Sequence, residues 1–302
     1  MTGINRRDFM MATAGAAGCL GGLCRTASAG KTPPQPEQTL LGKTGITVSR
    51  LAQGTGMRGW NRQSNQTRLG FEKFVALLRH AYERGITLFD LADLYGSHVY
   101  FREALRSIPR ERVTILTKLW WRYDAPIEPG AARYHRKWAR LALQRFRHEL
   151  ATDYIDIVLL HCMTRPDWDG ELQPYMEALA EAKDKKLVRA VGVSCHDIGA
   201  LRTAAASPWV DVVLARINPR GEKMDGTPEQ VVPVLRQIKQ AGKGLIGMKI
   251  YGEGRLVHIK DECIRFAMGL GLLDSMSIGF ESPEQIDETL RIMASVRQAG
   301  IT

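Results

Sequence analysis

Short apolar runs alternate with amphipathic segments along most of this chain. From residue 39 onward, runs rich in Val, Ile and Leu are followed by stretches whose apolar residues recur every three or four positions. The runs are typical of buried parallel strands, and the stretches are typical of helices that cover a sheet. The runs lie at 51–54, 87–92, 113–118, 155–161, 190–194, 210–217, 245–250 and 275–278. This alternation predicts an α/β fold consisting of a single (β/α)8 TIM barrel.

Turn and capping signals support this division into elements. The segment 71–85 repeats apolar residues at helical spacing and closes with Gly85, a helix C-terminal signal. Ser or Thr stands before Pro-Glu at 227–229 and at 282–284, which predicts two helix starts. The segment TLLGKTGITVSR predicts a short N-terminal hairpin that turns at 43–45, before the first barrel strand.

The first 29 residues differ from the rest of the chain. Arg6 and Arg7 precede a short apolar stretch that ends in the small residues Ala27-Ser28-Ala29. This arrangement resembles a twin-arginine export signal, and neither this stretch nor any later one has the roughly 20 apolar residues of a membrane span. We therefore expect a signal peptide at 1–29, a barrel at 30–302, and a periplasmic or secreted protein handled by the twin-arginine export machinery. A merely basic, apolar start, an uncleaved anchor and a lipid-modified Cys19 are the alternatives.

Composition narrows the choice of partners. The chain has 302 residues and a formal charge of +10, of which about +8 remains without residues 1–29, because these hold three Arg and one Asp. This charge favours anionic partners only weakly, and no nucleic-acid motif accompanies it. After residue 29 the cysteines are Cys162, Cys195 and Cys263, and this odd number predicts free thiols. The histidines show no metal-ligand spacing, so we expect no metal site.

The segment 130–150 is rich in Arg and Lys. It could form a surface for anionic glycans or lipid head groups. We favour a solvated barrel helix whose Trp138, Leu141, Ala142 and Phe146 pack inward.

Ionisable side chains stand at the ends of three consecutive predicted strands. Asp90, Lys118 and His161 each share a strand face with an apolar residue two positions earlier, and Tyr95 follows Asp90 in the next loop. Each could be structural by itself, as a buried ion pair or a core histidine. Together they predict an active site, because barrels carry their chemistry at the carboxyl ends of the strands.

The four groups suit proton transfer coupled to hydride transfer. Free tyrosine has a pKa of about 10, and a neighbouring ammonium lowers it by favouring the phenolate. We expect Lys118 to lower the pKa of Tyr95, Asp90 to hold Lys118 in an ion pair, and His161 to orient a carbonyl oxygen. Tyr95 is then the acid.

The segments FDLADLYG, TILTKLWW and TDYIDIVLLH resemble the catalytic segments of the aldo-keto reductase superfamily, and LGKTGITVSRLAQGTG is similar to its opening. The likeness runs from about residue 39 to 295. It implies that Asp90, Tyr95, Lys118 and His161 form the catalytic tetrad of an oxidoreductase. That enzyme would bind NADP or NAD across the strand ends and transfer hydride to or from a small-molecule carbonyl, alcohol or sugar. The resemblance also implies a set of cofactor-binding residues: Thr55, Ser194, Cys195, Lys249 toward the pyrophosphate, Gly279, Glu281, Ser282 and Gln285.

Several positions depart from the pattern of this superfamily. Cys195 replaces the asparagine that follows Ser194, and a thiol lacks the paired donor and acceptor of an amide. Leu214 stands in place of a glutamine, and Met248 in place of an aromatic that stacks on nicotinamide. Glu281 occupies a place that is often basic, where a carboxylate repels a 2′-phosphate and accepts from ribose hydroxyls, so NAD is at least as plausible as NADP.

The short segment after the last predicted helix and the predicted export of the protein suggest what kind of substrate and cofactor it uses. The sequence stops soon after the last predicted helix, so we expect the superfamily's C-terminal loop to be absent and the site to be open to a bulky substrate such as a sugar. His196 is a candidate substrate contact. Twin-arginine export of folded proteins implies a cofactor that is captured before export, stays bound and is recycled by a second substrate.

Two other functions remain open from the sequence. The changes at Cys195, Leu214 and Met248 favour a binding or accessory protein of the same fold that has lost productive hydride transfer. Tyr95 and Lys118 could also serve a lyase or an epimerase without redox chemistry.

Overall fold

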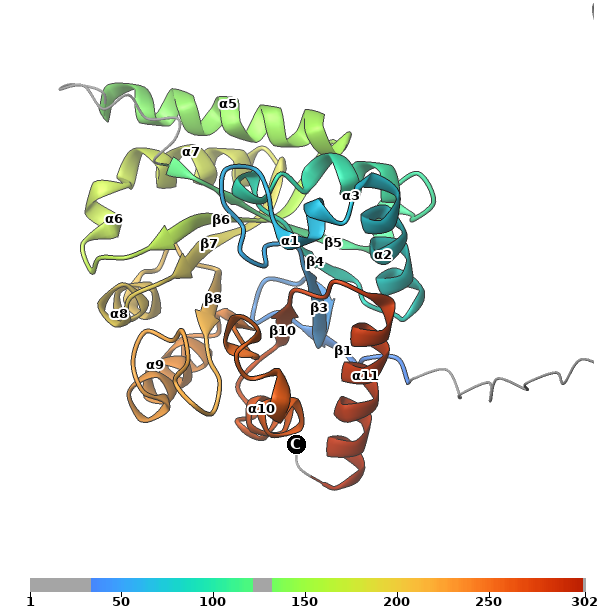
Figure 1. Cartoon of the computed structure of the whole chain (residues 1–302). Coiled ribbons are helices and arrows are strands. Elements are labelled where there is room, and N and C mark those ends of the chain that lie inside the picture. Colours follow the sequence, from blue (N-terminus) through green and yellow to red (C-terminus); the bar gives the residue numbers. More distant parts are fainter. Residues whose placement is uncertain (1–33, 122–131, 301–302) are drawn as a thin grey trace, which may run out of the picture. The chain divides into compact units, whose positions relative to one another are not determined.

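Eight parallel strands close into a barrel, which confirms the predicted fold. The computed structural model describes residues 34–121 and 132–300, so the predicted signal peptide lies outside the described residues. Each barrel strand pairs with the next along the chain, and the last pairs with the first (Figure 1). The barrel strands are β3 (Leu51–Gly54), β4 (Leu88–Asp90), β5 (Thr114–Leu119), β6 (Ile155–Met163), β7 (Val188–Cys195), β8 (Val212–Arg216), β9 (Gly244–Met248) and β10 (Ser275–Ile278).

Helices connect the strands and cover the outer face of the barrel (Figure 1). Two begin as their sequences predict: Thr227 and Ser282 are N-caps and proline follows each, while the Thr227 N–H donates to Gln230 Oε1 at 3.0 Å. The main helices are α2 (Phe71–Glu83), α3 (His98–Ala104), α5 (Ala132–Leu150), α7 (Gln173–Asp184), α8 (Ile198–Ala206), α9 (Pro228–Gln240), α10 (Lys260–Gly269) and α11 (Pro283–Gln298). The shorter ones are α1 (Asn65–Arg68), α6 (Trp168–Glu171) and the 3₁₀ turns η1 (Asp93–Tyr95), η2 (Arg110–Arg112), η3 (Gly252–Gly254) and η4 (Val257–Ile259).

Alternate residues of each strand face two separate apolar layers. Inward side chains such as Leu88, Leu116 and Leu159 fill the lumen and are fully buried. Outward side chains such as Phe89 and Ile115 pack against the helices. Burying one Leu or Phe stabilises a fold by about 1.5–3 kcal/mol, so the lumen is a packed core. Polar side chains that face inward therefore gather at the rim.

A two-stranded hairpin precedes the barrel, as predicted. It consists of β1 (Gln38–Leu40) and β2 (Thr47–Ser49), which pair antiparallel. Its side chains Leu41, Ile46 and Val48 are fully buried and belong to the lumen cluster. The Lys43 N–H donates to Gly242 O at 2.8 Å, two residues before β9 begins. The hairpin thus closes the end of the barrel opposite the rim that carries Asp90.

The basic helix α5 packs on α7 and pairs with its carboxylates. Arg136 lies 3.1 Å from Glu177 and also pairs with Glu181, and Arg140 lies 2.6 Å from Glu181. These pairs offset part of the charge that suggested a glycan or lipid surface, and they favour a structural barrel helix. The prediction that Leu141 packs inward is wrong, because this side chain is 43% exposed.

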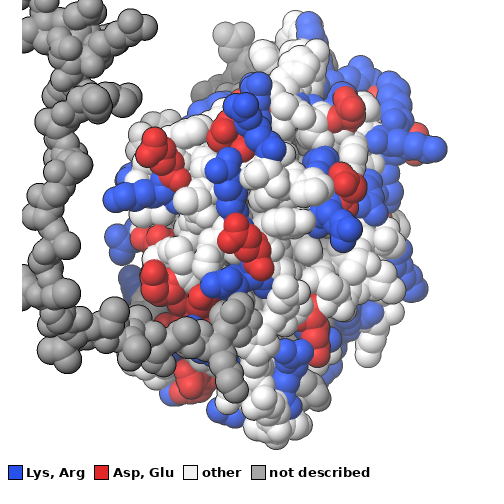
Figure 2. All heavy atoms as spheres, turned by 90° about the vertical axis from the view of Figure 1, so that its right-hand side faces the viewer, with Lys and Arg blue, Asp and Glu red and all other residues white. Residues whose placement is uncertain are grey.

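Charges of both signs are intermixed on the face formed by α2 and α11 (Figure 2). Arg84 of α2 lies 2.8 Å from Asp287 of α11, and His80 lies 2.9 Å from the same carboxylate. Among residues 34–121 and 132–300, no helix combines the length and the apolar character needed to cross a membrane.

Candidate active site

Three neighbouring strands carry the predicted ionisable groups to one rim of the barrel. Asp90 is the last residue of β4, Lys118 is next to last in β5, and His161 lies near the end of β6. In the strand register, Asp90 lies beside Leu116 and Lys118 beside Leu159, and both leucines face the lumen. The alternation along the strands therefore places the three side chains together at the carboxyl ends, as the sequence predicts.

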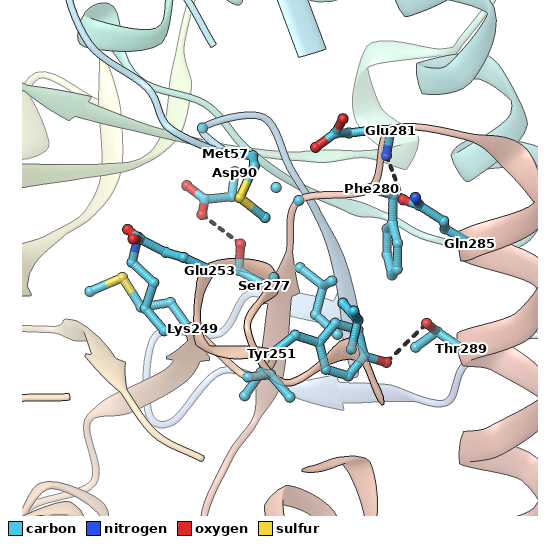
Figure 3. Close-up of a pocket in the computed structure, with 18 of the residues that line it drawn as sticks. Met57, Asp90, Lys249, Tyr251, Glu253, Ser277, Phe280, Glu281, Gln285 and Thr289 are labelled. Carbon is cyan, nitrogen blue, oxygen red and sulfur yellow. Dashed lines mark hydrogen bonds and ion pairs between the residues drawn. The ribbon is translucent and has the colours of Figure 1, made fainter. Parts of the chain in front are cut away.

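A buried ion pair forms the base of the site. The Lys118 ammonium, 1% exposed, pairs with the Asp90 carboxylate and donates a second hydrogen bond to Leu91 O at 3.0 Å. The Ser277 hydroxyl on β10 donates to the other Asp90 oxygen at 2.6 Å (Figure 3). Ser277 was not predicted from the sequence, although a serine at an inward position near the end of an apolar strand could have indicated it. These contacts hold the lysine in place beneath the tyrosine.

Tyr95 reaches this pair from the turn η1. Its hydroxyl lies 3.3 Å from His161 Nε2, and Lys118 Nζ lies 4.7 Å from the centre of its ring. Two glycines in the loop after β3 make room for the ring, because a Cβ on Gly56 or Gly59 would lie 2.3 or 2.4 Å from its atoms. The structure thus brings the four predicted catalytic residues into one cluster.

Burial controls the protonation of this cluster. It raises the pKa of Tyr95 well above its ordinary value, and the Asp90 carboxylate acts in the same direction. The prediction that Lys118 lowers the pKa of Tyr95 is therefore wrong for the protein without a bound cofactor or substrate. The reason is that desolvation of the buried phenol is the largest effect on the pKa of Tyr95. Burial also lowers the pKa of Lys118. Burial and the Lys118 charge lower the pKa of His161 well below its ordinary value. A neutral phenol and a neutral imidazole therefore lie side by side.

A pocket of about 310 Å³ opens beside Tyr95 and Asp90 (Figure 3). The loops that follow β9 and β10 form most of its wall, and α11 begins next to it. Barrel enzymes often bind phosphate groups at the loops after the seventh and eighth strands, and β9 and β10 are those strands here. Four of the predicted cofactor residues line the pocket: Lys249, Gly279, Glu281 and Gln285.

The other four predicted cofactor residues have structural contacts. The Thr55 hydroxyl donates to Asp90 O at 2.9 Å, and the Ser194 hydroxyl accepts from the Cys162 N–H at 2.9 Å. Ser282 is the N-cap of α11. The assignment of Cys195 needs correction: it is fully buried in the layer between strands and helices, because it follows the inward Ser194 and so faces outward.

Side chains that were not predicted from the sequence shape the pocket. Tyr251, Glu253, Lys260, Phe280 and Glu288 lie in its wall. Lys260 begins α10 and Glu288 lies in α11, while the other three follow β9 or β10. The fold decides how these segments surround the pocket, so local patterns in the sequence do not reveal them.

Both lysines in the pocket wall are paired with carboxylates. Lys249 pairs with Glu253, and Lys260 lies 2.6 Å from Glu288. Burial would raise the pKa of Glu253, but the bond and the charge of Lys249 outweigh it, so this pKa is lowered. The Glu281 carboxylate accepts from Asn65 Nδ2 at 2.9 Å, and the Glu281 N–H donates to Gln285 Oε1 at 2.8 Å. The pocket therefore holds carboxylates close to each of its cations.

His196 lies next to the tetrad, as the sequence suggested. Its Nε2 is 3.6 Å from the sulfur of Cys162, the residue after His161. Burial, followed by the charges of Arg216 and Lys249, lowers the pKa of His196 to about 2, so its imidazole is neutral. Within the part of the chain that the structure describes, Cys195 and Cys263 are free thiols, as the sequence predicts.

Comparison with known proteins identifies the family. A model described as the Aldo/keto reductase family matches residues 50–267. The chain belongs to this family. Aldo-keto reductase AFTS1 of Alternaria alternata is 32% identical over 254 residues, which are 74% of this chain and 67% of that protein. The NADH-specific methylglyoxal reductase of Escherichia coli is 27% identical over 213 residues, 65% of this chain and 62% of that protein.

Solved structures of aldo-keto reductases share the fold. AKR11C1 of Bacillus halodurans superimposes with a TM-score of 0.67 at 18% identity, over 87% of this chain and 95% of that one. The Bombyx mori reductase AKR2E4, in complex with NADP, gives a TM-score of 0.62 at 18% identity, over 87% and 92% of the two chains. The chain spans 62% of the length of the Escherichia coli relative and of a Glycine max aldo-keto reductase.

Proposed function

We propose that this aldo/keto reductase is an oxidoreductase that transfers hydride between a nicotinamide cofactor and a carbonyl or alcohol substrate. One observation carries the proposal. Tyr95, His161, Lys118 and Asp90 converge at the rim of the barrel, with the tyrosine hydroxyl 3.3 Å from His161 Nε2 and the pocket beside it. The family match supports the same reaction class.

The pocket fits a nicotinamide dinucleotide. Helix α11 begins at its wall, and the N-terminus of a helix attracts a phosphate through its free N–H groups and its dipole. Lys249 and Lys260 stand nearby as cations, and Tyr251 and Phe280 offer apolar surface for an adenine ring. The same pocket extends to Tyr95, so a molecule held by these loops would reach the tetrad.

The tetrad then performs acid catalysis. When bound, the nicotinamide supplies the hydride of the reduction. The neutral Tyr95 phenol donates its proton to the carbonyl oxygen, and an N–H on His161 Nε2 would hold that oxygen in line. The Lys118 ammonium stabilises the phenolate that Tyr95 becomes, while Asp90 and Ser277 keep the lysine in position. In the reverse direction, the same groups remove the proton of an alcohol.

The pocket supports NAD more than NADP. A 2′-phosphate needs a cation, and both lysines in the wall are paired with carboxylates. The Glu281 carboxylate would accept hydrogen bonds from the ribose hydroxyls and repel a 2′-phosphate.

Tyr95→Phe tests the proposal. Removing the hydroxyl is expected to lower kcat by about 100-fold or more, because general acid catalysis contributes at least that much. Dissociation constants of NADH and NADPH, measured by protein fluorescence, should stay near the wild-type values. A panel of aldehydes, ketones and aldoses serves as substrates. Equal activity of the variant and the wild type on all of them would exclude Tyr95 as the acid.

A specific observation favours a second function, a binding protein without hydride transfer. Leu214 and Met248 face the lumen at the rim, where the family's pattern has a glutamine and an aromatic residue. A wild-type protein that binds NADH and reduces no carbonyl in the panel would support this alternative. The buried Lys118 beside Tyr95 argues against it, because ligand binding alone does not require that pair.

We further propose that the protein acts outside the cytoplasm on a sugar or another bulky carbonyl, with a cofactor that stays bound. The twin-arginine pattern of residues 1–29 supports export. Replacing Arg6 and Arg7 with lysine should retain the protein in the cytoplasm, and cell fractionation measures this. Mass spectrometry of small molecules released from the exported protein tests for a retained nicotinamide.

A further inference from the structure

The turn that carries Tyr95 is held by ionisable side chains outside the tetrad. The turn η1 spans only Asp93–Tyr95, and so short a 3₁₀ segment is weakly held by its own hydrogen bonds. The Asp93 side chain is 2% exposed, and both of its oxygens accept from Arg145 of α5, at 2.8 and 2.9 Å. Such a two-bond pairing between guanidinium and carboxylate fixes orientation as well as distance.

The loop after β3 holds the same turn from another side. The Arg62 guanidinium lies 3.1 Å from Asp93, and the Arg62 N–H donates to Leu94 O at 2.9 Å. The Arg62 side chain is 53% exposed, whereas that of Arg145 is 30% exposed. Solvent therefore weakens the Arg62 pair more, and Arg145 is the principal partner of Asp93.

The contacts continue from Arg145 to the strand that carries Lys118. Arg145 donates to Glu149 at 3.0 Å, and the other Glu149 oxygen lies 2.7 Å from His98 Nδ1. His98 Nε2 lies 2.7 Å from the hydroxyl of Thr117, the residue before Lys118. Burial would raise the pKa of Glu149, but His98 and Arg145 outweigh it and lower the pKa to about 2. This chain of contacts therefore begins two residues before Tyr95 and ends one residue before Lys118.

The network lies apart from the pocket that adjoins Tyr95. Asp93, His98 and Glu149 line a separate hollow of about 460 Å³. Along β5, Thr117 alternates with the inward Lys118 and so faces the helices. A role in contacting the cofactor therefore does not explain this buried group of charges.

We propose that Asp93 and Arg145 are positioning residues for the reaction: they hold η1 so that the Tyr95 hydroxyl stays beside His161 and the Tyr95 ring stays over Lys118. We call the paired side chains of Asp93 and Arg145 the clamp. This inference rests on the proposed function, since the clamp is inferred to position Tyr95, the acid of that reaction. A misplacement of about 1 Å in a reacting group can cost about 100-fold in rate, so a rigid turn has a direct effect on kcat.

Arg145→Gln, with Asp93→Asn as a second and milder variant, tests the proposal. Each should lower kcat about 10- to 100-fold. The KM for the carbonyl and the dissociation constant of NADH should change far less than kcat. Arg145→Lys keeps the charge but loses the two-bond geometry, so its kcat should be intermediate. In the protein without added cofactor, amide hydrogen exchange of residues 93–98 should become faster in all three variants.

Asp156→Asn is the matched control. The Asp156 side chain is 1% exposed and pairs with two arginines, Arg110 at 2.7 Å and Arg189 at 2.8 Å. It lies at the start of β6, at the end of the barrel opposite the tetrad. This variant should lose a comparable amount of stability while its kcat and the exchange of residues 93–98 remain as in the wild type.

The outcomes separate this inference from the proposed function. A kcat of Arg145→Gln or Asp93→Asn that falls no further than that of Asp156→Asn would overturn the clamp, and so would unchanged exchange at residues 93–98. A wild-type protein that reduces no carbonyl contradicts the proposed function, and with it the catalytic purpose of the clamp. The exchange measurement then still reports whether Arg145 holds the turn.

Discussion

At the scale of single residues, Lys118 shows how a buried charge depends on its neighbours. Its ammonium is 1% exposed, and burial alone favours the neutral amine. The Asp90 carboxylate and the Leu91 carbonyl replace the water that this group loses. Ser277 in turn donates to the second Asp90 oxygen. The Lys118 charge that faces Tyr95 therefore depends on residues of three strands, β4, β5 and β10.

Lys118→Met is expected to destabilise the protein strongly. It leaves the Asp90 carboxylate buried without its counter-charge, which costs about 3–5 kcal/mol in free energy of unfolding. Urea denaturation followed by circular dichroism measures the loss. The double variant Asp90→Leu/Lys118→Met removes both charges and should recover most of it. If Lys118→Met alone is as stable as the wild type, Asp90 does not carry a buried charge that needs the Lys118 ammonium.

Glu281→Gln is expected to shift cofactor preference toward NADP. The variant removes a carboxylate that would repel a 2′-phosphate, so its affinity for NADPH relative to NADH should rise by about tenfold, or about 1.4 kcal/mol. Fluorescence titration with the two cofactors measures the ratio. Glu111→Gln, in η2 away from the pocket, is the control and should leave the ratio unchanged. An unaltered ratio in Glu281→Gln would show that the carboxylate does not discriminate.

At the scale of elements, the two ends of the barrel have separate tasks. The hairpin β1–β2 contributes Leu41, Ile46 and Val48 to the lumen core at one end. The short turn η1 and the loops after β9 and β10 gather around the tetrad at the other end. Stability and chemistry therefore depend on different connections of the same strands.

Ile46→Ala in the hairpin should reduce stability without changing catalysis. Ile46 is fully buried, and truncating a buried Ile to Ala costs about 2–5 kcal/mol. Leu40, the last residue of β1, is 61% exposed, so Leu40→Ala should change stability by less than about 0.5 kcal/mol. Thermal unfolding and kcat are measured for both. A large fall in kcat for folded Ile46→Ala would contradict the separation of the two ends.

At the scale of the whole molecule, buried neutral histidines couple stability to pH. His161 and His196 have pKa values well below the ordinary 6.5 in the folded protein, because of burial and nearby cations. In the unfolded chain both take up protons below about pH 6.5. The unfolded state then binds more protons than the folded state, so stability falls as the pH falls.

This linkage predicts a measurable loss of stability between pH 7.5 and 5. Each imidazole that stays neutral in the fold lowers the free energy of unfolding by at most about 1.4 kcal/mol for every pH unit below about pH 6.5. Glu149 acts in the same direction only below about pH 4.5, since its pKa falls from 4.5 to about 2 on folding. Urea denaturation across this range measures the slope, and His196→Gln should make it shallower. An identical slope in this variant would show that His196 is protonated in the fold.

The order and the periodicity of the sequence determined the barrel and the rim residues. Strand period and strand order are local properties, so Asp90, Lys118 and His161 could be placed on one rim before any contact was known. The helix starts at Thr227 and Ser282 followed from capping chemistry for the same reason.

Tertiary structure alone decided the environment of those residues. Burial raised the pKa of Tyr95, where the sequence had suggested the opposite shift, because desolvation depends on every element packed around a group. Cys195 follows Ser194 in the chain, yet the strand turns it toward the helices. Ser277 and Arg145 join the site from segments far away in the sequence. Such contacts join distant segments and are set by how the elements pack, which a local pattern does not specify.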